Sequence, residues 1–209
     1  MRVLVLGATG GTGRAIVRQA DAKGHSVVAL VRSKARAHEL DAATLVEGDA
    51  RDDDALARAL DGCSGVITAL GTGMSPFRTV TLLSTATRAL VKAMDRQGVR
   101  RLVCITGLGA GDSRGHGGFL FDTLILPLAL RNVYADKDRQ EAIVRASTLD
   151  WVMVRPVVLN DKPAKGRVRA TTDLSGVHGG TIARADVAGF VVEQLASDDW
   201  LHQTPLIKW

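Results

Sequence analysis

The sequence of 209 residues contains only two cysteines, Cys63 and Cys104, and they do not form a CxxC pair. Two isolated cysteines exclude a disulfide framework and a zinc site built from cysteine pairs. Cys104 lies within an apolar run, so we interpret it as a small buried side chain rather than as a nucleophile. No metal site is therefore expected.

Long apolar segments are also missing. The most apolar stretch, residues 119–130, is interrupted by Asp122 and Pro127. It is too short to cross a bilayer, and the N-terminal residues lack the pattern of a signal peptide. We therefore expect a cytoplasmic protein with no membrane partner.

Basic residues are not gathered in one block, although the formal net charge is +5. Nucleic-acid-binding surfaces usually show clustered lysine and arginine, whereas here these residues are spread and aromatic residues make up only 4%. We expect no nucleic-acid partner. The 46% of hydrophobic and 23% of charged residues are typical of a globular protein.

The N-terminal segment MRVLVLGATGGTGRAIV is the strongest motif present. An apolar strand over residues 2–6 ends at Gly7, and helical periodicity begins near Gly11. Gly7 permits a sharp turn, Gly10 lets phosphates approach the backbone, and Gly13 lets the helix pack against the strand. The N–H groups at the start of the helix attract an anion. This order predicts a site for the pyrophosphate of a dinucleotide, here with GxxGxxG spacing.

Strands and helices alternate along the rest of the chain. Further strands are expected over residues 26–31, 44–47, 65–70, 100–106, 150–155 and 204–209, and helices over 11–23, 52–60, 79–97, 119–131, 134–147 and 184–196. This alternation is typical of a doubly wound, mostly parallel sheet. We predict an α/β, Rossmann-type fold with a single domain over residues 1–209. Segments 107–133 and 157–183, the second with a short hairpin, are expected on the substrate side.

The second predicted strand ends without an acidic residue. In dinucleotide-binding folds an acid at this point accepts a hydrogen bond from the ribose of NAD, whereas an arginine accommodates the 2′-phosphate of NADP. Here Arg32, Lys34 and Arg36 occur instead, and the forked guanidinium groups of Arg32 and Arg36 suit a phosphate best. The alternative is a solvated start of a helix. The sequence favours NADP(H) over NAD(H).

Other candidate cofactor ligands follow the carboxyl ends of the strands, where open parallel sheets bind ligands. Asp49 is a candidate contact to adenine, with a turn or helix cap as its alternative role. Residues 71–73 are expected to pass along the ribose and phosphates. The residues expected to contact the cofactor are Gly7, Thr9, Gly10, Gly11, Thr12, Gly13, Arg32, Arg36, Asp49, Ala50, Ala69, Leu70, Gly71, Thr106, Gly107 and Pro156.

Four short motifs carry a family resemblance, namely GATGGTG, Gly48-Asp49, Thr106-Gly107 and Arg155-Pro156, which follow the first, third, fifth and sixth strands. With them the chain resembles the atypical short-chain dehydrogenase/reductase group. Within that group it is similar to NAD(P)H-binding proteins of the flavin reductase (biliverdin-IXβ reductase) and NmrA-like types. The resemblance implies a bound NADPH. It further implies either hydride transfer to a flavin or tetrapyrrole, chemistry that the cofactor carries, or redox sensing without turnover.

The candidate catalytic residues depart from the patterns of these families. Conventional short-chain dehydrogenases use YxxxK, in which the lysine lowers the tyrosine pKa, but here Lys137 follows Tyr134 after three positions. An i,i+3 pair also shares a helix face, so Thr106, Tyr134 and Lys137 are the candidate catalytic residues. Gly107 stands where flavin reductase-like proteins have serine. His116, in the glycine-rich loop after the fifth strand, is either a proton donor or merely exposed.

Three functions fit these residues. The basic cluster and the glycine-rich loop favour an NADPH-dependent oxidoreductase that reduces a small planar acceptor, such as a flavin or quinone. The absence of YxxxK and the presence of Gly107 suit a non-catalytic NADP(H) sensor of the NmrA-like type. The GxxGxxG spacing also suits an NAD-dependent epimerase or dehydratase, although little chain remains for a sugar-nucleotide lobe. The oligomeric state is left open.

Overall fold

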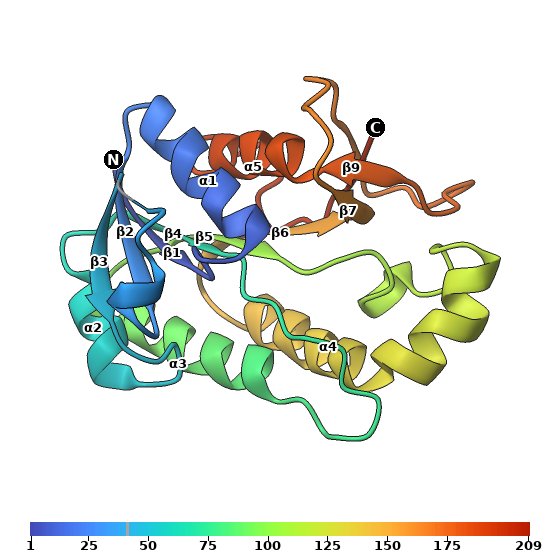
Figure 1. The fold of residues 1–209 in the computed structure, drawn as a ribbon, viewed down its shortest axis with the longest axis horizontal. Helices are drawn as coiled ribbons and strands as arrows, with labels where there is room; N and C mark the ends of the chain where they lie inside the picture. The colour runs from blue at the N-terminus through green and yellow to red at the C-terminus, as the bar shows by residue number, and fades with distance from the viewer. Residues whose placement is uncertain (41) are drawn as a thin grey trace.

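One eight-stranded sheet forms the centre of the computed structural model, which describes residues 1–40 and 42–209 (Figure 1). Its strands are β1 (Arg2–Leu6), β2 (Ser26–Val31), β3 (Ala43–Glu47), β4 (Gly65–Thr68), β5 (Arg101–Ile105), β6 (Asp150–Pro156), β8 (Arg169–Thr171) and β10 (Leu206–Lys208). The spatial order is β3-β2-β1-β4-β5-β6-β10-β8. All neighbours are parallel except β8, which runs antiparallel to β10. The first six strands have the order of dinucleotide-binding folds, which confirms the predicted fold class.

Helices cover both faces of the sheet, as Figure 1 shows. Helices α1 (Gly11–Ala22) and α5 (Arg184–Glu193) lie side by side on one face, and α2 (Asp53–Leu60), α3 (Leu82–Gln97) and α4 (Arg131–Arg145) lie on the other. Alternate residues of each strand point to opposite faces, so Val3 and Val5 join one apolar cluster while Leu4 and Leu6 join the other. No helix in the described residues is long and apolar enough to cross a membrane.

The chain reverses its direction of travel through the sheet between β1 and β4. Such a reversal leaves a crevice at the carboxyl ends of the strands, where ligands bind. Gly7 follows β1 with φ of +80°, and a Cβ there would lie 2.5 Å from the carbonyl oxygen of Ala69. A Cβ on Gly13 would lie 2.1 Å from the carbonyl oxygen of Gly7. Both positions therefore require glycine, for the turn and for close packing of α1.

The two helices expected over 119–131 and 134–147 are in fact continuous. A π-helical segment, η3 (Phe121–Leu130), leads directly into α4. Pro127 lies inside η3 and has no N–H to donate, so regular α-helical hydrogen bonding cannot be completed there. The predicted break at residues 132–133 was wrong.

The short hairpin expected in segment 157–183 is also absent from the described structure. Strand β7 (Val158–Asn160) pairs in parallel with β9 (Thr181–Ala183), while β8 pairs with β10. Each of these strands has only three residues, so its own sequence specifies little register. Their partners are set by the elements around them.

Candidate functional site

A cleft of about 930 Å³ extends along the carboxyl ends of the strands at the reversal between β1 and β4. Its volume lies at the upper end of the range of about 300–1,000 Å³ that is typical of small-molecule sites. Most residues expected to contact the cofactor line it, namely Gly7, Thr9, Gly10, Gly11, Thr12, Gly13, Arg32, Asp49, Ala50, Ala69, Leu70, Gly71 and Thr106. The glycine turn, the second strand end and the fifth strand end thus meet in one cavity.

Three expected residues lie outside this cleft. Arg36 lines an adjoining pocket of about 230 Å³ together with Thr9, Arg32 and Ser33. Gly107 and Pro156 are buried and line neither cavity. A Cβ on Gly107 would lie 3.6 Å from the hydroxyl of Tyr134, so this glycine borders the candidate catalytic side chains instead.

Several lining residues were not predicted from the sequence, namely Leu30, Val31, Arg51, Leu82, Ile105, Leu159 and Arg184. Leu30, Val31 and Ile105 end their strands, so the strand-end rule could have found them. Leu159 and Arg184 come from β7 and from the start of α5. No sequence signal connects these two residues to the glycine turn, because their position depends on the pairing of β7 with β9.

At one end of the cleft, Asp49 and Arg51 neutralise each other. The Arg51 Nη2 and Nε atoms lie 2.7 and 2.8 Å from the two carboxylate oxygens of Asp49. This hydrogen bonding lowers the pKa of Asp49 to about 2. Arg32 and Arg36 form no ion pair with any residue in the described part of the chain. The adjoining pocket therefore carries positive charge that a phosphate can neutralise.

At the other end of the cleft lie Thr106 and Lys137. The Lys137 Nζ donates to the carbonyl oxygen of Thr106 at 2.6 Å, and the Thr106 hydroxyl donates to Glu141 at 2.8 Å. The Tyr134 hydroxyl donates to the carbonyl oxygen of Leu108 at 2.9 Å. Tyr134 and Lys137 share a face of α4, as their spacing predicts. Their polar atoms and the Thr106 hydroxyl nevertheless bond to other partners rather than to one another.

Burial shifts the pKa values of both α4 side chains. It raises the pKa of Tyr134 to about 12, which is the opposite of the lowering that a tyrosine base requires. It lowers the pKa of Lys137 below the ordinary 10.5. Tyr134 does not line the cleft, whereas Lys137 does. Lys137 is thus the better placed of the two to exchange a proton with a bound molecule.

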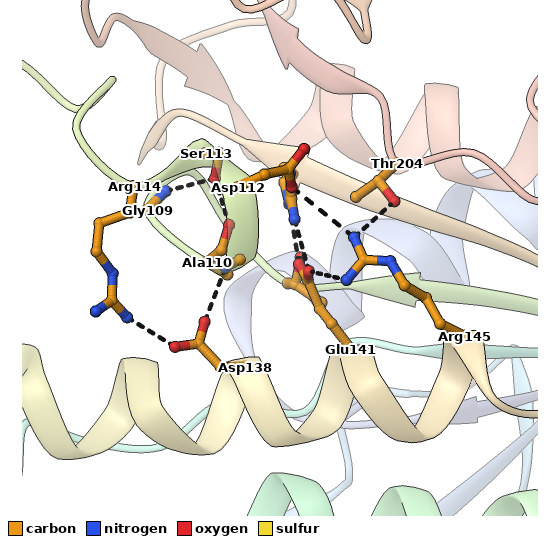
Figure 2. Close-up of polar contacts among 12 residues, drawn as sticks. Gly109, Ala110, Asp112, Ser113, Arg114, Asp138, Glu141, Arg145 and Thr204 are labelled. Carbon is orange, nitrogen blue, oxygen red and sulfur yellow. Dashed lines mark hydrogen bonds and ion pairs between the residues drawn. The ribbon is translucent and has the colours of Figure 1, made fainter.

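An ionic network around the buried pair Glu141 and Arg155 lies next to Thr106. Glu141 accepts two hydrogen bonds from Arg155, at 2.9 and 2.6 Å, and Arg145 lies 3.2 Å away. Arg155 also contacts Asp112 of the glycine-rich loop at 2.6 Å. Figure 2 shows Glu141 and Arg145 of α4 converging with Asp112 on this point. The network joins α4, β6 and the loop, and it occupies the hydroxyl of Thr106.

The glycine-rich loop is folded tightly against α4. The Gly111 N–H and the Arg114 guanidinium both donate to Asp138, at 2.8 and 2.7 Å (Figure 2). Gly111 has φ of +55°, and a Cβ there would lie 2.5 Å from Arg155 Nη2. His116 lines neither cavity, and its carbonyl oxygen accepts from the Gly179 N–H at 2.7 Å. Close packing therefore requires glycine at positions 109, 111 and 117 of this loop.

Comparison with known proteins identifies the family. A model of an NAD(P)H-binding family matches residues 7–198, which include the glycine turn and most of the cleft. The chain belongs to this NAD(P)H-binding family. The resemblance predicted from the sequence is thereby confirmed, and the cofactor is a nicotinamide dinucleotide, NAD(P)H.

The proteins to which this chain is similar differ in their described activities. The chain is 30% identical to the uncharacterized sugar epimerase YhfK of Bacillus subtilis, over 93% of this chain and 88% of that protein. ChuY, an anaerobillin reductase from Escherichia coli, is 25% identical, covers 100% of this chain and 97% of its own, and has a TM-score of 0.83. A short-chain dehydrogenase/reductase from Veillonella parvula in complex with NADP is 16% identical, covers 100% of this chain and 94% of its own, and has a TM-score of 0.76, which shows a shared fold.

Proposed function

We propose that this protein is an NADPH-dependent reductase that transfers hydride to a small planar acceptor. One observation carries the proposal: the cleft that Thr106 and Lys137 line adjoins the basic pocket of Arg32 and Arg36, and Thr9 and Arg32 line both cavities. The residues fit a dinucleotide, because the glycine turn leaves its backbone open and a Cβ on Gly10 would meet only the Gly7 oxygen, at 3.4 Å.

The preference for NADPH over NADH rests on the adjoining pocket. Arg32 and Arg36 present guanidinium groups there, and Thr9 and Ser33 add hydroxyl groups. These are the groups that bind a phosphate with several charge-assisted hydrogen bonds. Asp49, the acid of this region, is already neutralised by Arg51. The pocket is therefore suited to the 2′-phosphate that distinguishes NADPH.

The planar acceptor is supported by the apolar walls near Thr106 and Lys137. Leu82, Ile105 and Leu159 line the cleft from α3, β5 and β7. Apolar side chains beside a few placed polar groups are typical of small-molecule sites. The reductase name of ChuY agrees with this choice. Bound NADPH supplies the hydride, and Lys137 is the group placed to hold or donate the accompanying proton.

A tyrosine-dependent epimerase is less well supported. Such chemistry needs a tyrosine that can lose its proton, yet burial raises the pKa of Tyr134 to about 12. The Tyr134 hydroxyl also donates to the Leu108 carbonyl oxygen rather than facing the cleft. The contacts of Tyr134 thus favour reduction, in which the cofactor performs the main chemistry, over epimerisation.

Steady-state oxidation of NADPH tests the proposal. FMN, riboflavin, a tetrapyrrole and a quinone should be offered in turn, with NADH in parallel. We expect acceptor-dependent oxidation with at least one of them, and a lower KM for NADPH than for NADH. Tight NADPH binding without oxidation by any acceptor would contradict the reductase and favour the sensor. Discrimination between NADP⁺ and NADPH in calorimetry would then support that second function.

A further inference from the structure

Arg184, the first residue of α5, reaches into the cofactor cleft beside the glycine turn. It lines the cleft, and its side chain is 28% exposed. A Cβ placed on Gly11 would lie 3.0 Å from the Cδ and 3.1 Å from the Nε of Arg184. The arginine side chain therefore lies across the first turn of α1, although 173 positions separate the two residues in the sequence.

This contact explains the extra glycine in GATGGTG. Gly11 does not have a positive φ, so its backbone conformation is open to any residue. A Cβ at this position would instead contact the Cδ and Nε of Arg184 more tightly than usual, so the arginine side chain would have to shift. Glycine at position 11 thus keeps room for the arginine at the edge of the turn.

The pairing of β7 with β9 determines the position of Arg184 at the start of α5. Asn160 is in register with Ala183, so the next residues of the two strands, Asp161 and Arg184, are neighbours. The Nη1 of Arg184 lies 2.8 Å from Asp161, whose side chain is 84% exposed. An ion pair this exposed stabilises the fold only slightly. A guanidinium has five N–H donors, so Asp161 orients the group and leaves donors for another anion.

The cations that line the cleft lie at different parts of the cofactor site. Asp49 accepts from both the Nε and the Nη2 of Arg51, whereas Asp161 accepts only from the Nη1 of Arg184. Lys137 donates to Thr106 at the far end. Arg32 borders the adjoining basic pocket. Arg184 is the cation beside the glycine turn, where the diphosphate of a dinucleotide lies in this fold. Building on the cofactor cleft of the proposed function, we propose that Arg184 binds this diphosphate and thereby ties the substrate-side segment to the cofactor.

The loop after β7 is also held against the start of α5. Asp186, two residues after Arg184 in α5, accepts from the N–H groups of Lys165 and Gly166 at 2.9 Å each. Asp161 and Asp186 thus hold both ends of residues 161–166 against the start of α5. We expect an anion bound to Arg184 to stabilise this turn, so binding of a dinucleotide should slow amide hydrogen exchange at Lys162, Ala164, Lys165 and Gly166.

Isothermal titration calorimetry with three probes tests the assignment. NADPH and NADH contain the diphosphate, whereas 2′-AMP contains only the phosphate that Arg32 is expected to bind. We expect Arg184→Gln to weaken the binding of NADPH and of NADH by the same factor, about tenfold or more, because a charge-assisted hydrogen bond is lost. Binding of 2′-AMP should not change. The affinity of Arg184→Lys for both dinucleotides should lie between those of the wild type and Arg184→Gln. Arg167 is an exposed arginine of the same segment, and Arg167→Gln should bind as the wild type does.

The opposite pattern is expected for Arg32→Ala, which should weaken the binding of NADPH and 2′-AMP and leave the binding of NADH unchanged. Unchanged binding of both dinucleotides by Arg184→Gln would overturn the assignment. An equal loss of affinity for 2′-AMP in Arg184→Gln would also overturn it. Hydrogen exchange gives a second readout, because NADH should protect the amides of Lys162, Ala164, Lys165 and Gly166 in the wild type and not in Arg184→Gln. A wild type that binds both dinucleotides through Arg184 yet reduces no acceptor would support this inference and contradict the reductase.

Discussion

Arg155 and Glu141 form a bidentate ion pair in which neither side chain is more than 1% exposed. Removing the Glu141 charge leaves the buried Arg155 with only Asp112 as an acidic partner, and that side chain is 74% exposed and therefore screened by water. We therefore expect Glu141→Gln to lower the free energy of unfolding by about 3–5 kcal/mol. Urea denaturation followed by circular dichroism measures this loss.

The exposed ion pair between Arg100 and Asp150 is the matched control. Asp150→Asn should cost less than about 1 kcal/mol, because water screens that pair. Combining Glu141→Gln with Arg155→Met should cost less than the sum of the two single losses, since no full charge then remains buried. A loss for Glu141→Gln no larger than that for Asp150→Asn would show that the pair does not hold α4 against β6.

Arg32 is expected to set the preference for NADPH. Arg32→Ala should weaken NADPH binding by about 1–3 kcal/mol, the value of a hydrogen bond to a charged group. NADH should bind almost unchanged. Lys34 is a suitable control, because it is basic and near in sequence but lines neither cavity. Fluorescence titration of the variants measures both affinities, and equal losses for NADPH and NADH would assign Arg32 another role.

Lys137 and Tyr134 should differ sharply in kinetic experiments. Lys137→Met should lower kcat by about a hundredfold, within the range for removal of a proton donor. Tyr134→Phe should leave kcat nearly unchanged, because that hydroxyl bonds to the Leu108 backbone. In the wild type, the rate should fall as pH rises through the pKa of Lys137, which lies below 10.5. A stronger effect of Tyr134→Phe than of Lys137→Met would reverse these assignments.

Asp186 should make the stability depend on pH in acid. Burial alone would raise the pKa of Asp186, but donors from Lys165, Trp209 and Gly166 bring it below the ordinary 3.8. A carboxyl with a lowered folded pKa stabilises the fold fully above its unfolded pKa and loses this effect as pH falls through the folded value. The stability lost in Asp186→Asn should therefore be constant near neutral pH and shrink below about 4. Urea midpoints across that range test this, and a loss independent of pH would contradict it.

The central sheet was predictable because its strands are buried on both faces and read as apolar runs. Residues 2–6 and 26–31 match β1 and β2 at both ends. The glycine turn was equally clear, since steric contact at Gly7 and Gly13 leaves no choice of residue. The cofactor end of the site follows from these local rules.

Long-range contacts account for what was not predicted. Helix α3 begins at Leu82 rather than near residue 79, because Asp136 of α4 accepts from the N–H of Leu83 at 2.8 Å. The Thr106 hydroxyl faces Glu141, which lies 35 positions away. No periodicity or spacing in one sequence encodes such pairs, so the hydrogen-bonding of Thr106, Tyr134 and Lys137 was not predictable.

The position of β10 in the sheet has a consequence for synthesis. This strand pairs with β6 through Leu206 and Arg155, yet it is made after α5 and after every other strand. Until it emerges from the ribosome, β6 presents a bare, apolar edge, and such edges invite pairing with other chains. A nascent chain halted before Leu206 should therefore be prone to aggregation and a natural client for chaperones.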